Sequence, residues 1–236
     1  MSRGPASPTL AGMVTLDVIS DPICPWCWIG KTRLDRALAA AGDPPPFAIR
    51  WRPFQLNPEM PPEGMDRADY LAAKFGGREA AERVYRRVTD ACAEAGLDFD
   101  PARIARTPNT LDAHRVIRWA AVEGGQDAAV DRLFALNFRE GRDISGPEAL
   151  AEAGAAGGLD PAVVRELLAS DADREAVREE DAAAREMGVS GVPTFVVAGK
   201  YVVQGAQDED LWSRVIAELR AAAAAGPDAG PAPKAG

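Results

Sequence analysis

Cys24 and Cys27 stand in a C-x-x-C pattern near the start of the chain, with Pro25 and Trp26 between them. Two thiols at this spacing can exchange disulfides, because the thiolate of one attacks a substrate disulfide and the other then resolves the mixed disulfide. We expect Cys24 to be the attacking thiol and Cys27 the resolving one. The pattern therefore predicts thiol–disulfide exchange.

Half of a zinc site is the other common role of a C-x-x-C pattern. Zinc would need two further ligands, and besides carboxylates the chain offers only Cys92 and His114, which do not form a second pair. Cys92 falls on the apolar face of a predicted helix, where a lone cysteine is usually a small packing residue. We expect no metal site and no catalytic role for Cys92.

The segments around the cysteine pair place it at the start of a helix. Residues 14–20 form an apolar, β-branched run typical of a buried strand, and residues 28–41 carry apolar side chains at helical spacing. Pro25 suits the first helical position. Unpaired N–H groups and the helix dipole favour a thiolate at this end, so we expect Cys24 to be reactive, with Trp26 beside it.

Further β segments complete a predicted sheet. Residues 47–54 alternate apolar and polar side chains, and the helix before them predicts a parallel β-α-β unit with the first strand. Residues 188–206 are rich in Val and aromatic side chains and turn at Ala198-Gly199-Lys200, which predicts an antiparallel hairpin. A closing helix is expected over residues 208–224.

A long helical region separates the two halves of the sheet. Residues 58–188 show no convincing strand, which predicts an inserted all-helical domain. The remaining domain is expected over residues 13–57 and 189–224, with disordered segments at 1–12 and 225–236. The helices predicted in the insertion span residues 66–75, 78–95, 110–122, 128–138, 147–156, 161–169 and 172–187.

Composition excludes several classes of partner. The chain has 236 residues, with 36 Asp and Glu against 27 Lys and Arg and a net charge of −9, so neither nucleic acid nor a membrane is an expected partner. No apolar run is long enough to span a membrane, and residues 1–12 lack the parts of a secretory signal. With three cysteines and no disulfide scaffold, we expect a cytoplasmic protein.

The chain resembles the DsbA family of thioredoxin-fold proteins, and its cytoplasmic FrnE-like branch in particular. The resemblance rests on Cys24-Pro25-Trp26-Cys27 after a strand and extends over about residues 13–220. Further matching segments are residues 51–58, 108–115 and 190–195. The resemblance implies an α/β fold, thioredoxin-like with a large inserted all-helical domain, and protein-disulfide oxidoreductase activity.

The resemblance also implies roles for residues outside the cysteine pair. It implies that Pro193 is cis and faces the cysteines, and that the backbone of Val192 pairs with the substrate. We also expect Trp28, Asn109 and His114 at the substrate site. His114 is the only histidine, and an imidazole near a cysteine favours the thiolate when it is charged.

One residue departs from the family pattern. Periplasmic members carry histidine between the cysteines, where this chain has Trp26. We therefore expect the Cys24–Cys27 disulfide to be less oxidising than theirs. The expected partners are protein disulfides or thiols, with glutathione as a candidate thiol partner and no tightly bound cofactor, in a monomer or a homodimer.

Two other functions remain open at this point. 2-Hydroxychromene-2-carboxylate isomerases and kappa-class glutathione transferases resemble the same fold, so a glutathione-dependent isomerase or transferase is the alternative. Those relatives typically carry serine where this chain has Cys24, which favours the oxidoreductase. A zinc-holding or chaperone-like binding module would instead leave the thiols unreactive.

Overall fold

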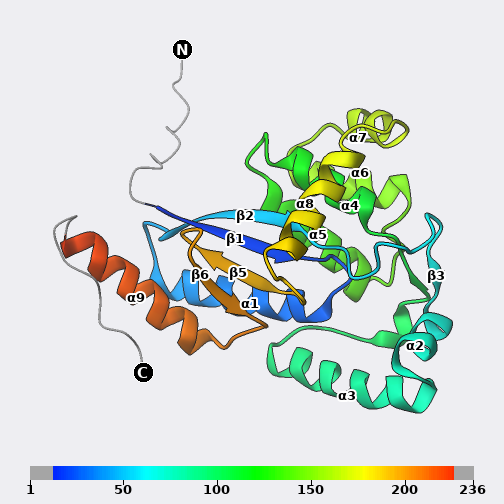
Figure 1. Cartoon of the computed structure of the whole chain (residues 1–236), viewed down its shortest axis with the longest axis horizontal. Helices are drawn as coiled ribbons and strands as arrows, with labels where there is room; N and C mark the ends of the chain where they lie inside the picture. Colours follow the sequence, from blue (N-terminus) through cyan, green and yellow to red (C-terminus); the bar gives the residue numbers. More distant parts are fainter. Residues whose placement is uncertain (1–12, 226–236) are drawn as a thin grey trace.

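A mixed four-stranded sheet is the centre of the fold in the computed structural model, which describes residues 13–225 (Figure 1). Its strands follow the order β2-β1-β5-β6. β2 is parallel to β1, β5 is antiparallel to β1, and β6 is antiparallel to β5. The strands are β1 (Val14–Ser20), β2 (Phe47–Pro53), β5 (Thr194–Val197) and β6 (Tyr201–Gln204). The predicted parallel unit and hairpin are both confirmed.

Two helices cover one face of the sheet. α1 (Pro25–Ala41) joins β1 to β2 and packs against α9 (Glu209–Ala225), the closing helix. Trp212 of α9 is fully buried, and its ring meets that of Phe195 on β5 edge to face at 4.8 Å. Burial of two aromatic side chains at this contact anchors α9 to the sheet, since a buried aromatic contributes on the order of 2 kcal/mol.

The chain between β2 and β5 is mostly helical and surrounds the end of the sheet where β1 leads into α1 (Figure 1). α8 packs on the face opposite α1, where Ile19 of β1 and Ala184 of α8 share a small apolar cluster. The helices of this region are α2 (Arg67–Phe75), α3 (Arg78–Glu94), α4 (Leu111–Ala120), α5 (Gln126–Phe134), α6 (Pro147–Ala156), α7 (Pro161–Leu168) and α8 (Arg174–Glu186).

Some details of this region differ from the sequence prediction. The strands β3 (Met65–Asp66) and β4 (Arg106–Thr107) form a two-residue antiparallel ribbon, which is too short to leave an alternating pattern. The predicted helix 128–138 is α5 followed by a π-helical turn, Ala135–Arg139. A 3-10 turn, Pro101–Arg103, precedes β4. The predicted tail at 1–12 lies outside the described residues, as does 226–236, while Ala225 belongs to α9.

Candidate active site

The cysteine pair lies where β1 ends and α1 begins. Cys24 is the N-cap residue of α1, in extended conformation, and Pro25 occupies the first helical position. The Cys24 carbonyl accepts a hydrogen bond from the Cys27 N–H at 3.0 Å, which closes the first turn. The two thiols are therefore held on one turn, at the helix end whose unpaired N–H groups favour negative charge.

The loop before β5 faces Cys24. The Cys24 thiol donates to the Val192 carbonyl oxygen, with a distance of 3.5 Å between sulfur and oxygen, and the Val192–Pro193 peptide bond is cis. Pro193 also limits the neighbouring helix, because a Cβ added at Gly30 of α1 would stand 3.0 Å from the proline Cγ. A segment 168 residues away along the chain thus lies directly against the Cys24 sulfur.

The two cysteines differ in their surroundings. Cys24 is 4% exposed and Cys27 is 1% exposed, while the Trp26 side chain between them is 39% exposed. Burial raises the pKa of Cys27 well above its ordinary value, and the hydrogen bond and charge of Cys24 raise it further against opposing contacts from Ser20 and the Asp21 backbone. Cys27 is therefore held as a thiol, which suits a resolving cysteine.

A buried Asp21–His114 pair lies next to the turn that leads from β1 to Cys24. The carboxylate of Asp21 is fully buried and accepts from the backbone N–H groups of Ile23 at 3.3 Å and Leu56 at 2.7 Å. Burial raises the pKa of Asp21 to about 7 despite these hydrogen bonds. The His114 Nε2 atom lies 3.9 Å from Asp21 Oδ1 without a hydrogen-bond partner, and burial lowers the pKa of His114 to about 4.

The Asp21–His114 pair is thus uncharged between about pH 4 and 7. The one ion-pair contact recorded for His114 among residues 13–225 is with Asp21, and the expected closeness of its imidazole to the Cys24 thiolate stays a prediction. Asp21 is not among the residues that the sequence analysis predicts for the site. Its sequence signal is an acidic residue at the end of the first strand, three positions before the first cysteine.

The other residues expected at the site are held by neighbours within the protein. The Asn109 side chain accepts from the Leu111 N–H at 2.9 Å and donates to the Met60 carbonyl at 2.6 Å, so it ties the start of α4 to the preceding loop. The Trp28 ring is buried and stacks on Phe138 at 5.3 Å. Their role in substrate binding stays a prediction.

The third cysteine is a packing residue. Cys92 is fully buried on the apolar face of α3, and burial raises its pKa to about 12. Its thiol therefore stays protonated near neutral pH. Within residues 13–225, no three His, Cys, Asp or Glu side chains are grouped to hold a metal ion. No helix in the same range is long and apolar enough to cross a membrane.

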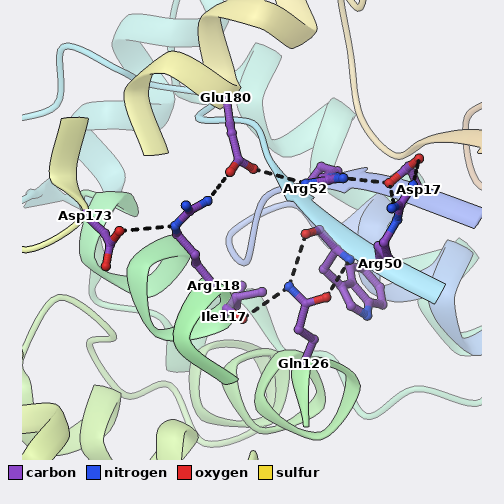
Figure 2. Close-up of polar contacts among 9 residues, drawn as sticks. Asp17, Arg50, Arg52, Ile117, Arg118, Gln126, Asp173 and Glu180 are labelled. Atoms are coloured by element: carbon purple, nitrogen blue, oxygen red, sulfur yellow. Dashed lines mark hydrogen bonds and ion pairs between the residues drawn. The ribbon is translucent and has the colours of Figure 1, made fainter. Parts of the chain in front are cut away.

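A cavity of about 320 Å³ lies along β2, an edge strand of the sheet. The Gln126 amide pairs with both backbone groups of Trp51 on that edge, at 3.1 and 3.3 Å, as a neighbouring strand would (Figure 2). Three arginines and three carboxylates near the cavity neutralise one another in a chain of ion pairs. In order along the chain of contacts they are Arg50, Asp17, Arg52, Glu180, Arg118 and Asp173. This network serves the fold, because none of its charges lacks a partner.

The chain is similar to a known protein family and to several solved structures. A sequence model described as a DSBA-like thioredoxin domain matches residues 15–217. The structure of the probable DsbA oxidoreductase SCO1869 from Streptomyces coelicolor is 28% identical and superposes with a TM-score of 0.78, over 94% of each chain.

Two further structures share the fold at lower identity. A 2-hydroxychromene-2-carboxylate isomerase is 17% identical with a TM-score of 0.66, over 87% of this chain and 96% of its own. The cytosolic disulfide reductase DsbM from Pseudomonas aeruginosa, solved with GSH, is 19% identical with a TM-score of 0.63, over 87% of this chain and 99% of its own.

Proposed function

Because the chain belongs to the DSBA-like thioredoxin domain family, we propose that it is a thiol–disulfide oxidoreductase that acts through Cys24 and Cys27. One observation carries the proposal: Cys24 is the N-cap residue of α1 and its sulfur lies 3.5 Å from the Val192 carbonyl oxygen, with the buried Cys27 thiol one turn away. We also propose that the chain belongs to the FrnE-like branch, which its motifs resemble.

The proposed reaction has two exchange steps. The Cys24 thiolate attacks one sulfur of a substrate disulfide, which forms a Cys24–substrate disulfide and releases the other sulfur as a thiolate that takes up a proton. Cys27 then loses its proton and attacks the Cys24 sulfur, which forms the Cys24–Cys27 disulfide and releases the second substrate thiol. The substrate gains two electrons and the cysteine pair loses them, and the reverse sequence oxidises a dithiol.

The Val192–Pro193 segment would position the substrate during both steps. Once a substrate sulfur is bonded to Cys24, the Val192 carbonyl no longer receives the thiol hydrogen bond that it accepts in this structure. We propose that it then accepts a hydrogen bond from the substrate, as an extended backbone beside a cleft can. Pro193 contributes by holding this carbonyl against α1.

Protein disulfides or thiols and glutathione are the proposed partners, in the cytoplasm. DsbM, a structure of the same fold, is described as a cytosolic reductase and was solved with GSH, which supports glutathione as the first small thiol to try. A chain with three cysteines, each a free thiol, also suits a reducing compartment. No tightly bound cofactor is needed for these steps.

A glutathione-dependent isomerase is the second candidate, because the fold is shared with a 2-hydroxychromene-2-carboxylate isomerase over nearly the whole of that chain. An isomerase would turn over such a substrate with glutathione and would not need Cys27. Loss of isomerisation in Cys24→Ser together with full activity in Cys27→Ser would favour this candidate over the oxidoreductase.

Trapping the mixed disulfide tests the proposed function. Cys27→Ser leaves the attacking thiol without its resolving partner, so incubation with oxidised glutathione should add one glutathione to Cys24, seen as a mass shift that dithiothreitol reverses. Wild type should instead form the Cys24–Cys27 disulfide. Cys92→Ser is the matched control and should behave as wild type. An absence of adduct in Cys27→Ser would contradict the proposal.

A further inference from the structure

Five polar side chains from α2, α3 and the loop after β2 form a connected group, here called the α2–α3 cluster. Its members are Asn57, Arg67, Tyr70, Lys74 and Tyr85. Lys74 Nζ donates to the Tyr70 hydroxyl at 2.6 Å, which donates to Asn57 Oδ1 at 2.9 Å. Arg67 donates to the Tyr85 hydroxyl, and its guanidinium carbon lies 5.2 Å from the centre of that ring and 6.0 Å from that of Tyr70.

The α2–α3 cluster holds two positive charges without a carboxylate. Neither Arg67 nor Lys74 forms a salt bridge with any residue between 13 and 225, and the arginine is only 7% exposed. Its Nε–H and the Nδ2 of Asn57 are both buried without an acceptor. Buried charges in proteins are normally paired, and a buried donor without an acceptor is costly. The cluster is therefore short of a negatively charged hydrogen-bond acceptor.

Aromatic contacts connect the cluster to α1, the helix that carries the cysteine pair. A run of aromatic contacts joins Tyr85 to Phe99 at 6.4 Å, Phe99 to Phe138 at 5.7 Å, and Phe138 to Trp28 of α1 at 5.3 Å. α3, which carries Tyr85, packs along α1. Figure 1 shows α2 and α3 next to the end of the sheet where β1 leads into α1.

The charges of the two sites also influence each other. Burial raises the pKa of Tyr85, Arg67 opposes this, and the charges of Tyr70 and Cys24 add to the rise. The Lys74 charge likewise lowers the pKa of Asp21, against the larger rise that burial causes. A negative group on a molecule bonded to Cys24 would therefore lie within the field of the cluster.

We propose that the α2–α3 cluster binds a carboxylate of a small thiol or disulfide while the sulfur of that molecule reacts with Cys24. The proposal rests on the proposed function and adds a substrate class to it. A carboxylate supplies the negative charge that Arg67 and Lys74 lack among their hydroxyl acceptors, and an acceptor for the unmet donors of Arg67 and Asn57. A small molecule is the occupant because the Cys24 side chain is only 4% exposed.

The binding would act on the reduction of the oxidised pair. The incoming thiolate attacks Cys24, which forms a bond between the two sulfurs, breaks the Cys24–Cys27 bond and releases Cys27 as a thiolate that takes up a proton. A carboxylate held by the cluster favours this encounter. A charge-assisted hydrogen bond corresponds to about a tenfold gain in rate over a neutral analogue.

Matched thiols test the carboxylate preference on the oxidised full-length protein. N-acetylcysteine is compared with its amide, and glutathione with its diethyl ester, each rate being corrected to thiolate concentration and to the reactivity of the thiol with a small disulfide. The proposal expects the acid to react about tenfold faster than its neutral analogue in at least one pair. Equal rates within both pairs would overturn it.

Variants separate the cluster from general charge. Lys74→Gln should bring the ratio of the acid rate to the neutral-analogue rate toward one. Lys200→Gln removes an exposed lysine elsewhere, on the β5–β6 hairpin, and should leave this ratio unchanged. Arg67→Gln should act like Lys74→Gln, and because Arg67 is buried the exposed Lys74 carries the test if that variant does not fold. An unchanged preference in Lys74→Gln would overturn the assignment.

A neutral thiol distinguishes failure of the inference from failure of the proposed function. 2-Mercaptoethanol carries no carboxylate, so its reduction of the Cys24–Cys27 disulfide depends only on the cysteine pair. If it reacts while no acid is preferred, the α2–α3 cluster is not a carboxylate site and the oxidoreductase stands. If no thiol reacts at all, the proposed function itself is wrong.

Discussion

At the residue scale, the chemistry depends on a difference between two thiols in one helical turn. Cys24 is the N-cap residue of α1, and its thiol donates a hydrogen bond to the Val192 carbonyl oxygen. Cys27 is buried next to Ser20 and the backbone of Asp21. Sequence spacing alone makes the two sulfurs equivalent. Their unequal burial comes from the β1–α1 loop and the Pro193 segment packed around them.

Alkylation of the native reduced protein should report this difference. Iodoacetamide at pH 8 should label Cys24 at least about tenfold faster than Cys27, because burial raises the pKa of Cys27 and only a thiolate reacts. Cys92, with a pKa raised to about 12, should stay unlabelled until the chain unfolds. Peptide mass mapping over time provides the measurement. Equal labelling of Cys24 and Cys27 would contradict the assigned roles.

The Asp21–His114 pair makes a prediction about pH. Between about pH 4.5 and 6.5 the folded protein holds one proton on Asp21, whose pKa is raised to about 7, and none on His114, whose pKa is lowered to about 4. The unfolded chain holds none on the aspartate and one on the histidine. The two contributions to the pH dependence of unfolding therefore cancel in the wild type.

Single substitutions should break this cancellation with opposite signs. In Asp21→Asn the unfolded chain binds the extra proton, so stability relative to wild type should fall on acidification by about 1.4 kcal/mol per pH unit. In His114→Asn the folded protein binds the extra proton, so stability should rise by a similar amount. Urea unfolding at pH 4.5, 5.5 and 6.5 measures both slopes. Slopes parallel to wild type in both variants would contradict the uncharged pair.

At the element scale, Lys31 ties the active-site helix to the insertion. Its ammonium group on α1 is buried and lies 2.7 Å from Asp35 of the same helix and 3.0 Å from Asp127 and Asp131 of α5. Burial lowers the pKa of Lys31 while the three aspartates raise it by more, so the net shift is upward and the group stays charged. These contacts fix the orientation of α1 against α5.

Removing the ammonium should destabilise the protein through the carboxylates that remain. Lys31→Met is expected to lower the free energy of unfolding by about 2 kcal/mol, less than for a fully buried pair because the three aspartates are half exposed. Adding Asp131→Asn should recover part of the loss by relieving repulsion. Urea unfolding of the single and double variants measures this, and a double variant less stable than Lys31→Met would contradict it.

The elements that come from local patterns could be predicted from the sequence. The apolar run before Cys24, the proline after it, the alternation at 47–54 and the Val-rich segments around the turn at 198–200 each depend on neighbouring residues, and the sheet was predicted correctly. The β3–β4 ribbon and the π-helical turn could not be predicted in this way. The ribbon pairs residues about 40 positions apart. The π-helical turn continues α5, and its apolar side chains follow a pattern that an α-helix would also show.

The candidate site was predictable only in part, for a related reason. The cysteine pair could be found from its spacing, and the cis bond before Pro193 was implied by the resemblance. The pairing of Asp21 with His114 and the burial of Arg67 without a carboxylate depend on contacts between distant segments. Buried polar side chains of this kind leave no periodic signal in a sequence.

At the scale of the whole molecule, the sheet presents the cysteine pair and the inserted helices enclose it. β1 leads into Cys24, β5 begins just after the Val192–Pro193 segment, and α2 and α3 supply the cluster of positive charge on the remaining side. The protein carries a net charge of −9, so a cluster with two cations and no carboxylate contrasts with its overall charge. This arrangement suits exchange with a small acidic thiol.

The redox equilibrium of Cys24 and Cys27 tests the central claim most directly. The protein is equilibrated against graded ratios of reduced and oxidised glutathione, and the disulfide is read from the mass shift after alkylation, with Cys24→Ser as the control. We predict a reversible two-electron transition with a potential between about −270 and −120 mV, the range of known exchange enzymes. Thiols that never form the disulfide across this range would contradict the account.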